Sequence, residues 1–263
     1  MSHALSALSR TSLTAAVCLQ DVSKRYGAFQ ALAPLSLTIE PGEMIALLGP
    51  SGSGKTTLLL LISGQLEASA GRIVLQGKDL ASMHPGKELA RLVGMVHQQF
   101  DLVPNLSALH NVLAGRLSDW DVFTSLVSLL WPHDRVLGMT ALARVGVEDR
   151  ASLRAGQLSG GEKQRVAIAR LLVQDPAVVL ADEPVASLDP ARAEEIIRLL
   201  VEVVQQANKT LVASMHSLDL ARKYCSRLIG LRNGVVQFDL PSSAVTAEAL
   251  ESLYSLEGLG DER

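Results

Sequence analysis

The segment Gly49–Thr56, GPSGSGKT, has the residue types and spacing needed to bind phosphate, between a predicted strand (44–48) and an apolar helix (55–63). Its glycines let backbone N–H groups turn toward phosphate oxygens, and the helix N-terminus adds the positive end of its dipole. Lys55 offers a charge for the β- and γ-phosphates, and the Thr56 hydroxyl is a ligand for Mg²⁺. The expected nucleotide-binding residues here are Gly49, Pro50, Ser51, Gly52, Ser53, Gly54, Lys55, Thr56 and Thr57.

A second segment places two acids at the end of an apolar run. Residues 177–181 predict a buried strand, and Asp182 and Glu183 follow it directly. Ligands of parallel sheets bind beyond the carboxyl ends of strands, so we expect Asp182 to hold Mg²⁺ and Glu183 to polarise an attacking water. By itself the pattern also fits a strand that runs into a solvated turn, and the phosphate-binding segment favours the catalytic interpretation.

The two segments are far apart in the chain, farther than a small nucleotide kinase or GTPase requires. Within this gap, Leu158–Arg165 reads LSGGEKQR and predicts a helix with Ser159 as its N-cap. Gly160 and Gly161 expose further N–H groups at its start, which makes a second anion-binding helix terminus. Because one nucleotide needs only one phosphate loop, the second suggests a contact with the nucleotide of another subunit.

The elements that would position these residues alternate between strands and helices. Residues 17–40 predict two antiparallel strands with a turn near Tyr26 and Gly27. Residues 90–157 lose the strand pattern and predict helices at 107–117, 121–130 and 135–145. The α/β pattern then returns, which favours a mostly parallel sheet covered by helices, with a helical insert. The expected elements are strands 44–48, 71–75, 177–181, 210–215, 227–231 and 235–238 and helices 55–63, 161–174, 190–207 and 217–224.

Composition excludes several classes of protein. The chain has 263 residues, 48% of them hydrophobic, which is enough for a large core and excludes a disordered chain. The net charge of −3 gives no basic footprint for nucleic acid. Two cysteines exclude a disulfide framework, and no apolar run reaches the length of a membrane-spanning helix.

The order and spacing of the three motifs along the chain, with LSGG between the phosphate loop and the acidic strand end, resemble those of the ATP-binding cassette (ABC) family of transport ATPases. The resemblance covers residues 17–240. The resemblance implies an α/β fold: a RecA-like P-loop core with a mostly parallel sheet, an antiparallel β subdomain and a helical subdomain at about 91–157. It leaves a flexible tail at 1–16 and a tail without a motif at 241–263. It also implies four further site residues: Gln98 for Mg²⁺ and water, His216 for the γ-phosphate, Tyr26 for stacking on adenine, and Asp189 at the dimer interface.

The same resemblance implies a mechanism and partners. Two chains are expected to pack head to tail around ATP and Mg²⁺, with Ser159, Gly160 and Gly161 of one facing the phosphate loop of the other. Catalysis would fall to Glu183, His216, Lys55 and Gln98. Separate transmembrane permease subunits would be gripped by the helical insert, and a substrate-binding protein would be an indirect partner. The chain would lie peripherally on the cytoplasmic face of the bacterial inner membrane, without a nucleic-acid partner.

Flanking residues narrow the resemblance to the phosphonate-import ATPases of bacteria. These are Val185–Asp189, His97–Val103, Ala141–Val147, Tyr224–Arg227 and Leu231–Gly234. Two segments depart from the usual family pattern, Glu162-Lys163 after LSGG and Ser214-Met215-His216-Ser217 at the end of a strand. Importers of phosphite or another oxyanion, an exporter ATPase, a soluble non-transport ABC clamp and a small-molecule kinase stay open as alternatives.

Overall fold

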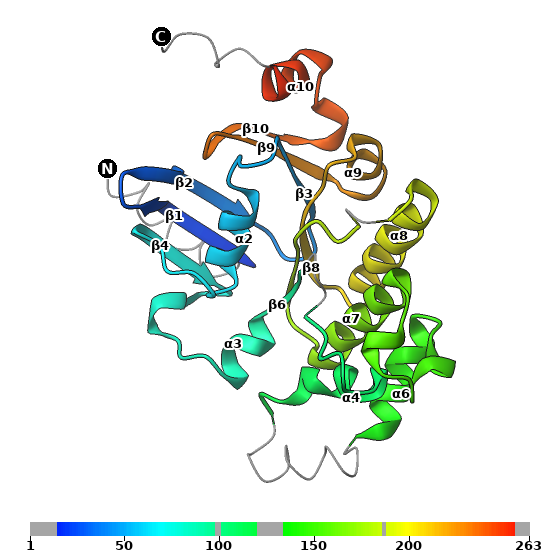
Figure 1. Ribbon diagram of the computed structural model, residues 1–263. Helices are drawn as coiled ribbons and strands as arrows, with labels where there is room; N and C mark the ends of the chain where they lie inside the picture. The colour runs from blue at the N-terminus through cyan, green and yellow to red at the C-terminus, as the bar shows by residue number, and fades with distance from the viewer. Residues whose placement is uncertain (1–14, 98–100, 120–133, 186–187, 256–263) are drawn as a thin grey trace.

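The computed structural model describes residues 15–97, 101–119, 134–185 and 188–255, whose strands form two sheets (Figure 1). The smaller sheet is antiparallel, in the order β2-β1-β4-β5, as the sequence predicts for its first two strands. Tyr26 pairs with Phe29 across the turn that closes the first hairpin. The strands are β1 (Val17–Tyr26), β2 (Phe29–Ile39), β4 (Ala70–Leu75) and β5 (Lys78–Asp79).

The larger sheet has six strands in the order β10-β9-β3-β8-β7-β6. Neighbours from β9 to β6 are parallel, and only β10 runs antiparallel to the strand beside it. This confirms the predicted α/β fold with a mostly parallel sheet. The strands are β3 (Met44–Leu48), β6 (Val93–Val96), β7 (Val178–Ala181), β8 (Thr210–Ser214), β9 (Arg227–Arg232) and β10 (Val235–Pro241).

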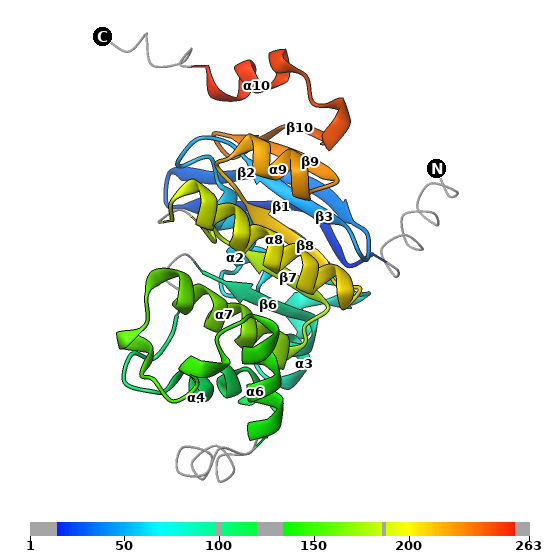
Figure 2. The same ribbon diagram turned by 90° about the vertical axis from the view of Figure 1, so that its right-hand side faces the viewer.

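Helices cover both faces of the larger sheet because its central strands are apolar on both sides, with every residue of β3, β7 and β8 buried. On one face, α2 (Lys55–Ile62) lies between the two sheets and joins their strands in one apolar core (Figure 1). On the other face, α8 (Pro190–Gln206) and α9 (Leu218–Tyr224) belong to a second core (Figure 2).

A group of helices projects beyond β6 in both views (Figures 1 and 2). It contains α4 (Ala108–Leu113) and α6 (Arg135–Arg144), as predicted for this region, and both pack on α7 (Gly160–Gln174). The predicted helix 121–130 lies outside the described residues. Single 3₁₀ turns occur at Leu80–Ser82, Ala114–Arg116, Glu148–Arg150, Ala155–Gln157 and Ser242–Ala244.

Besides the two-residue strand β5 and the 3₁₀ turns, three elements were not predicted. Helix α3 (Lys87–Leu92) leads into β6, and β6 pairs in parallel with β7. The expected helical region at about 91–157 therefore begins too early, because Val93–Val96 form an edge strand of the larger sheet. The expected C-terminal tail likewise contains a helix, α10 (Ala247–Tyr254), which lies beside β9 and β10 at the top of Figure 1.

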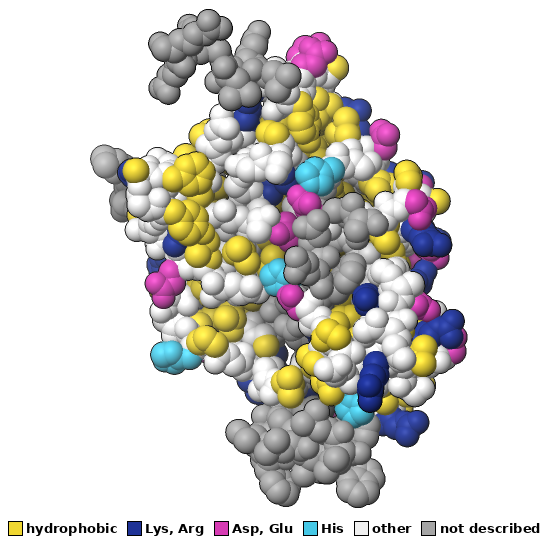
Figure 3. Space-filling view, in the orientation of Figure 1, with side chains coloured by type: hydrophobic (Ala, Val, Ile, Leu, Met, Phe, Trp, Pro, Cys, Tyr) yellow, Lys and Arg dark blue, Asp and Glu magenta, His cyan; other side chains and the backbone are white. Residues whose placement is uncertain are grey.

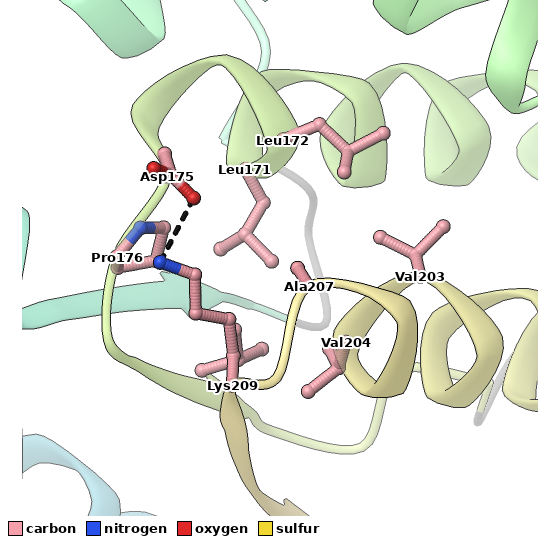
Figure 4. Close-up of a pocket in the computed structure, with 9 residues that line it drawn as sticks. Leu171, Leu172, Asp175, Pro176, Val203, Val204, Ala207 and Lys209 are labelled. Carbon is pink, nitrogen blue, oxygen red and sulfur yellow. Dashed lines mark ion pairs between the residues drawn. The ribbon is translucent and has the colours of Figure 1, made fainter. Parts of the chain in front are cut away.

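A small apolar pocket lies between the C-terminal ends of α7 and α8 (Figure 4). Leucine and valine side chains line it, and an ion pair of 3.0 Å joins Asp175 to Lys209 at its side. Asp175 and Lys209 precede β7 and β8, so the pocket lies at the amino ends of the parallel strands. It is therefore at the opposite edge of the sheet from the phosphate loop.

No helix within the described ranges is long and apolar enough to cross a membrane. On the face shown in Figure 3, basic and acidic side chains are interspersed rather than gathered by sign.

Candidate functional site

The carboxyl ends of three neighbouring strands bring the predicted motifs together. Strand β8 lies between β3 and β7, and all three run in the same direction. The phosphate loop follows β3, Asp182 and Glu183 follow β7, and His216 comes two residues after β8. Segments separated by more than 120 residues thus meet at one edge of the sheet, where ligands of such folds bind.

The phosphate loop is shaped by two glycines that no other residue could replace. Gly49 has φ 144°, and a Cβ there would overlap the carbonyl oxygen of Leu231. Gly54 has φ 103°, and a Cβ would come within 2.9 Å of the Ala31 carbonyl oxygen. Gly54 is also the N-cap of α2, and no side chain caps this helix. An anion-binding helix terminus needs N–H groups that no side chain occupies, and the start of α2 meets this condition.

Lys55 is held inside the loop. Its Nζ donates hydrogen bonds to the carbonyl oxygens of Gly49 at 2.8 Å and Pro50 at 3.0 Å. Burial lowers the pKa of the Lys55 ammonium, whereas the nearby carboxylates of Glu183 and Asp182 raise it. The ammonium is positioned between the loop and the acidic strand end, where a charge can neutralise phosphate.

Asp182 is fixed by two hydroxyl groups. The Thr56 Oγ1 donates to its Oδ1 at 3.1 Å, and the Ser214 Oγ donates to the same oxygen at 2.7 Å. The Ser214 Oγ also accepts a hydrogen bond from the Glu183 N–H at 2.8 Å. The buried serine thereby sets the positions of both acids. A hydroxyl beside a carboxylate is a donor set of hard oxygens that suits Mg²⁺.

Glu183 lies beside His216, which follows β8. The His216 Nε2 lies 2.6 Å from the Glu183 Oε1, and an ionised carboxylate accepts the hydrogen bond that the ring nitrogen donates. Glu183 has φ 45°, which is an uncommon backbone conformation for a residue with a side chain. The contacts of its backbone and side chain with β8 and the residues after it hold the carboxylate at the phosphate loop.

A pocket opens between the phosphate loop and the β1–β2 hairpin. Tyr26 and Phe29 lie at its outer side with 51% and 66% of their surfaces exposed, and hydrophobic side chains gather over this hairpin in Figure 3. Exposed apolar patches of this kind commonly mark binding sites. The pocket is lined by Tyr26, Phe29, Ala31, Ser51, Gly52, Ser53, Gly54, Lys55, Thr56, Thr57 and Glu183.

The residues of the LSGG segment lie elsewhere. Ser159 caps α7 by accepting a hydrogen bond from the Glu162 N–H, and the Glu162 carboxylate accepts one from the Ser159 N–H. A hydrogen bond from Arg150, at 2.7 Å, lowers the pKa of Glu162 to about 2. Asp189 similarly caps α8. Ser159, Gly160, Gly161 and Asp189 are not among the described residues that line the pocket.

The described residues leave out one predicted ligand of Mg²⁺. Gln98 lies outside the described residues, in the segment that follows β6. Its neighbour His97 contacts Asp101 and Gln65. Within the described ranges, no cluster of three or more His, Cys, Asp or Glu residues could hold a metal by itself. An ion bound by Thr56 and Asp182 would therefore need further oxygen ligands, which phosphate groups can supply.

Sequence reasoning missed several residues of the site, among them Ser214 and Phe29. Ser214 is a polar side chain in an apolar strand, but its contacts are with residues more than 30 positions away. Phe29 lies opposite Tyr26 in the hairpin, so its proximity follows only from the strand register. The sequence did offer one signal for Phe29, since two aromatic residues flank the predicted hairpin turn.

The fold and this site define a phosphate-loop nucleotide-binding protein, since a free helix terminus, a buried lysine and an acidic strand end share one edge of a parallel sheet. The profile of the ABC transporter family matches residues 32–186. This chain belongs to that family, whose cassettes bind and hydrolyse ATP.

Relatives match nearly the whole chain. The phosphonates import ATP-binding protein PhnC of Rhizobium etli is 42% identical over 91% of this chain and 86% of its own length. The protein of that name from Thiobacillus denitrificans is 42% identical over 94% and 95%. That from Bradyrhizobium diazoefficiens is 44% identical over 91% and 90%.

Solved structures share the fold. An ATP-binding cassette solved as a dimer bound to ADP and phosphate is 32% identical, has a TM-score of 0.74, and is matched over 86% of this chain and 98% of that one. An ABC transporter cassette in its ADP conformation is 26% identical with a TM-score of 0.76, over 92% and 96%.

Proposed function

We propose that this chain is the ATP-hydrolysing subunit of an ABC importer that takes up phosphonates. Identity above 40% over most of the length of curated phosphonate-import subunits supports the cargo. The 2.6 Å contact between His216 and Glu183 beside the phosphate loop is the observation that carries the chemistry. It holds a carboxylate in a fixed orientation beside the phosphate loop, which supports a role for Glu183 in orienting an attacking water.

These positions support the following catalytic roles. Glu183 acts as the base that orients and polarises water, and His216 both fixes this carboxylate and steadies the γ-phosphate. Lys55 leaves the loop carbonyls and binds the β- and γ-phosphates, supported by the free N–H groups at the start of α2. Phosphoryl transfer depends mainly on such positioning and charge neutralisation.

Mg²⁺ fits the oxygen donors of this site. Thr56 and Asp182 would hold it, and Gln98 is proposed as a further ligand. Bound there, the ion neutralises charge that develops on the phosphate oxygens. Ser214 keeps Asp182 in place for this role.

The base of the nucleotide is proposed to stack on Tyr26, with Phe29 as a second aromatic contact. Both rings line the pocket and are exposed. Stacking of a base on an aromatic side chain contributes about 1–3 kcal/mol.

A second copy is proposed to complete each site head to tail. Ser159, Gly160, Gly161 and Asp189 lie at helix N-termini outside the chain's own pocket, which supports a contact with the partner's nucleotide. Transmembrane permease subunits would bind the helical region, and a substrate-binding protein would deliver the cargo from outside. This assembly puts the chain on the cytoplasmic face of the bacterial inner membrane, without nucleic acid.

Growth of the host on defined phosphorus sources tests this proposal. An in-frame Glu183→Gln allele is expected to abolish growth on a phosphonate and to leave growth on phosphate unchanged. A matched Glu194→Gln allele changes a surface ion pair with Lys223 and should grow normally. Loss on phosphite alone would overturn the phosphonate assignment in favour of an oxyanion importer. Normal uptake of phosphonate by the Glu183→Gln strain would contradict the transport role and favour the alternative of a soluble, non-transport ABC clamp.

A further inference from the structure

Helix α10, which has no role in the function proposed above, is firmly attached to the sheet that carries the phosphate loop. Thr246 caps its first turn, and Leu253 is fully buried. Arg232, the last residue of β9, donates hydrogen bonds to the Ser252 carbonyl, the Ser255 Oγ and the Ser255 carbonyl. The guanidinium therefore fixes the C-terminal end of the helix at the end of β9.

This end of α10 contacts the first residue of the phosphate loop. The Gly49 N–H donates a hydrogen bond of 3.2 Å to the Tyr254 hydroxyl. The tyrosine oxygen accepts this bond through a lone pair, and burial raises the pKa of the Tyr254 hydroxyl. Gly49 also packs so closely on the Leu231 carbonyl that no side chain fits, and Leu231 adjoins Arg232.

Both polar groups of Gly49 are thus occupied. Tyr254 accepts from its N–H, while its carbonyl accepts from Lys55 Nζ at 2.8 Å. A tilt of the first peptide groups of the loop would alter both contacts together, because the residue joins them covalently. Gly49 therefore links a side chain of the C-terminal helix to the lysine that would bind phosphate.

We propose that α10 braces the phosphate loop and that Tyr254 is a positioning residue for nucleotide binding, acting through the N–H of Gly49. The inference rests on the ATP-binding part of the proposed function and is independent of the transported cargo. Tyr254 touches the loop backbone and is not among the residues that line the pocket, so its effect is on loop geometry.

The test compares Tyr254→Phe with Tyr224→Phe in the full chain. Each substitution removes one tyrosine hydroxyl. The Tyr224 hydroxyl donates to the Glu194 carboxylate rather than to the phosphate loop. We expect Tyr254→Phe to weaken MgADP binding about fivefold, the loss expected of one neutral hydrogen bond, and to speed amide exchange at Gly49 without nucleotide. Tyr224→Phe should change neither quantity.

Arg232→Gln offers a second variant that keeps the tyrosine hydroxyl and loosens the helix end. It should also weaken MgADP binding and speed exchange at Gly49, with the unfolding midpoint measured alongside. Unchanged affinity and exchange in folded Tyr254→Phe would overturn the brace. Failure of the unsubstituted chain to bind MgADP would instead overturn the proposed function.

Discussion

Helices α2 and α7 both begin at glycine-rich segments, but only α7 has side chains that cap its first N–H groups. No side chain caps α2, which opens on the nucleotide pocket. Helix α7 has a complete capping box between Ser159 and Glu162, reinforced by Arg150. The first terminus is built to receive an anion, whereas the second is stable without one. In its cap, the Ser159 Oγ uses a lone pair, which leaves its proton free to be donated to another molecule.

Glu183→Gln should give the largest effect, because it removes the proposed base and leaves the α2 terminus intact. We expect ATP hydrolysis to fall by about 10²–10⁴-fold with ATP affinity unchanged. Phosphate release and equilibrium ATP binding measure the two quantities. Glu194→Gln serves as the control, and hydrolysis by Glu183→Gln at the unsubstituted rate would remove Glu183 from the mechanism.

Ser159→Ala tests whether the capped terminus does more than begin a helix. We expect hydrolysis to fall about tenfold or more, as for the loss of a hydrogen bond to a charged group, while MgADP affinity of the isolated chain stays unchanged. Ser107→Ala removes the equivalent N-cap of α4 and should cost about 1 kcal/mol of stability without this kinetic effect. Equal kinetic losses in the two variants would reduce Ser159 to a structural cap.

Tyr26→Ala should weaken MgADP binding by about 1–3 kcal/mol, and Phe29→Ala by a smaller amount, because each removes one stacking surface. Tyr26→Phe keeps the ring and should bind nearly normally. Titration of each variant with MgADP gives the comparison. Full affinity in Tyr26→Ala would place the base away from the β1–β2 hairpin.

Glu162→Gln should have the smallest effect, below about 1 kcal/mol, because the ion pair with Arg150 is partly exposed. The carboxyl has a pKa of about 2 in the folded protein and an ordinary value of 4.5 when unfolded, so its contribution is fully present above the unfolded value and is lost as pH falls toward 2. Urea unfolding of both proteins at pH 7 and pH 4 should show the difference shrinking with acidity. A difference that grows as pH falls would contradict this assignment.

The sequence predicted those parts of the site whose structure depends on residues close together in the chain. The phosphate loop and the apolar strand before Asp182 are recognisable because glycine spacing and an unbroken apolar run dictate their structure. Strand β6 was missed because four residues with a central glycine become a strand only by pairing with β7, more than 80 positions later. The contacts of Ser214 and Tyr254 likewise join distant segments, so composition and periodicity do not reveal them.

We propose that in each nucleotide site one chain supplies the uncapped α2 terminus and its partner supplies the capped α7 terminus. Light scattering of Glu183→Gln protein, with and without MgATP, tests it most directly, beside a Glu183→Gln/Ser159→Arg variant. We predict that MgATP doubles the mass of the first protein. The second protein should bind ATP and stay a monomer, because its α7 terminus is blocked. Equal pairing of both proteins would contradict a nucleotide site shared between α2 and α7.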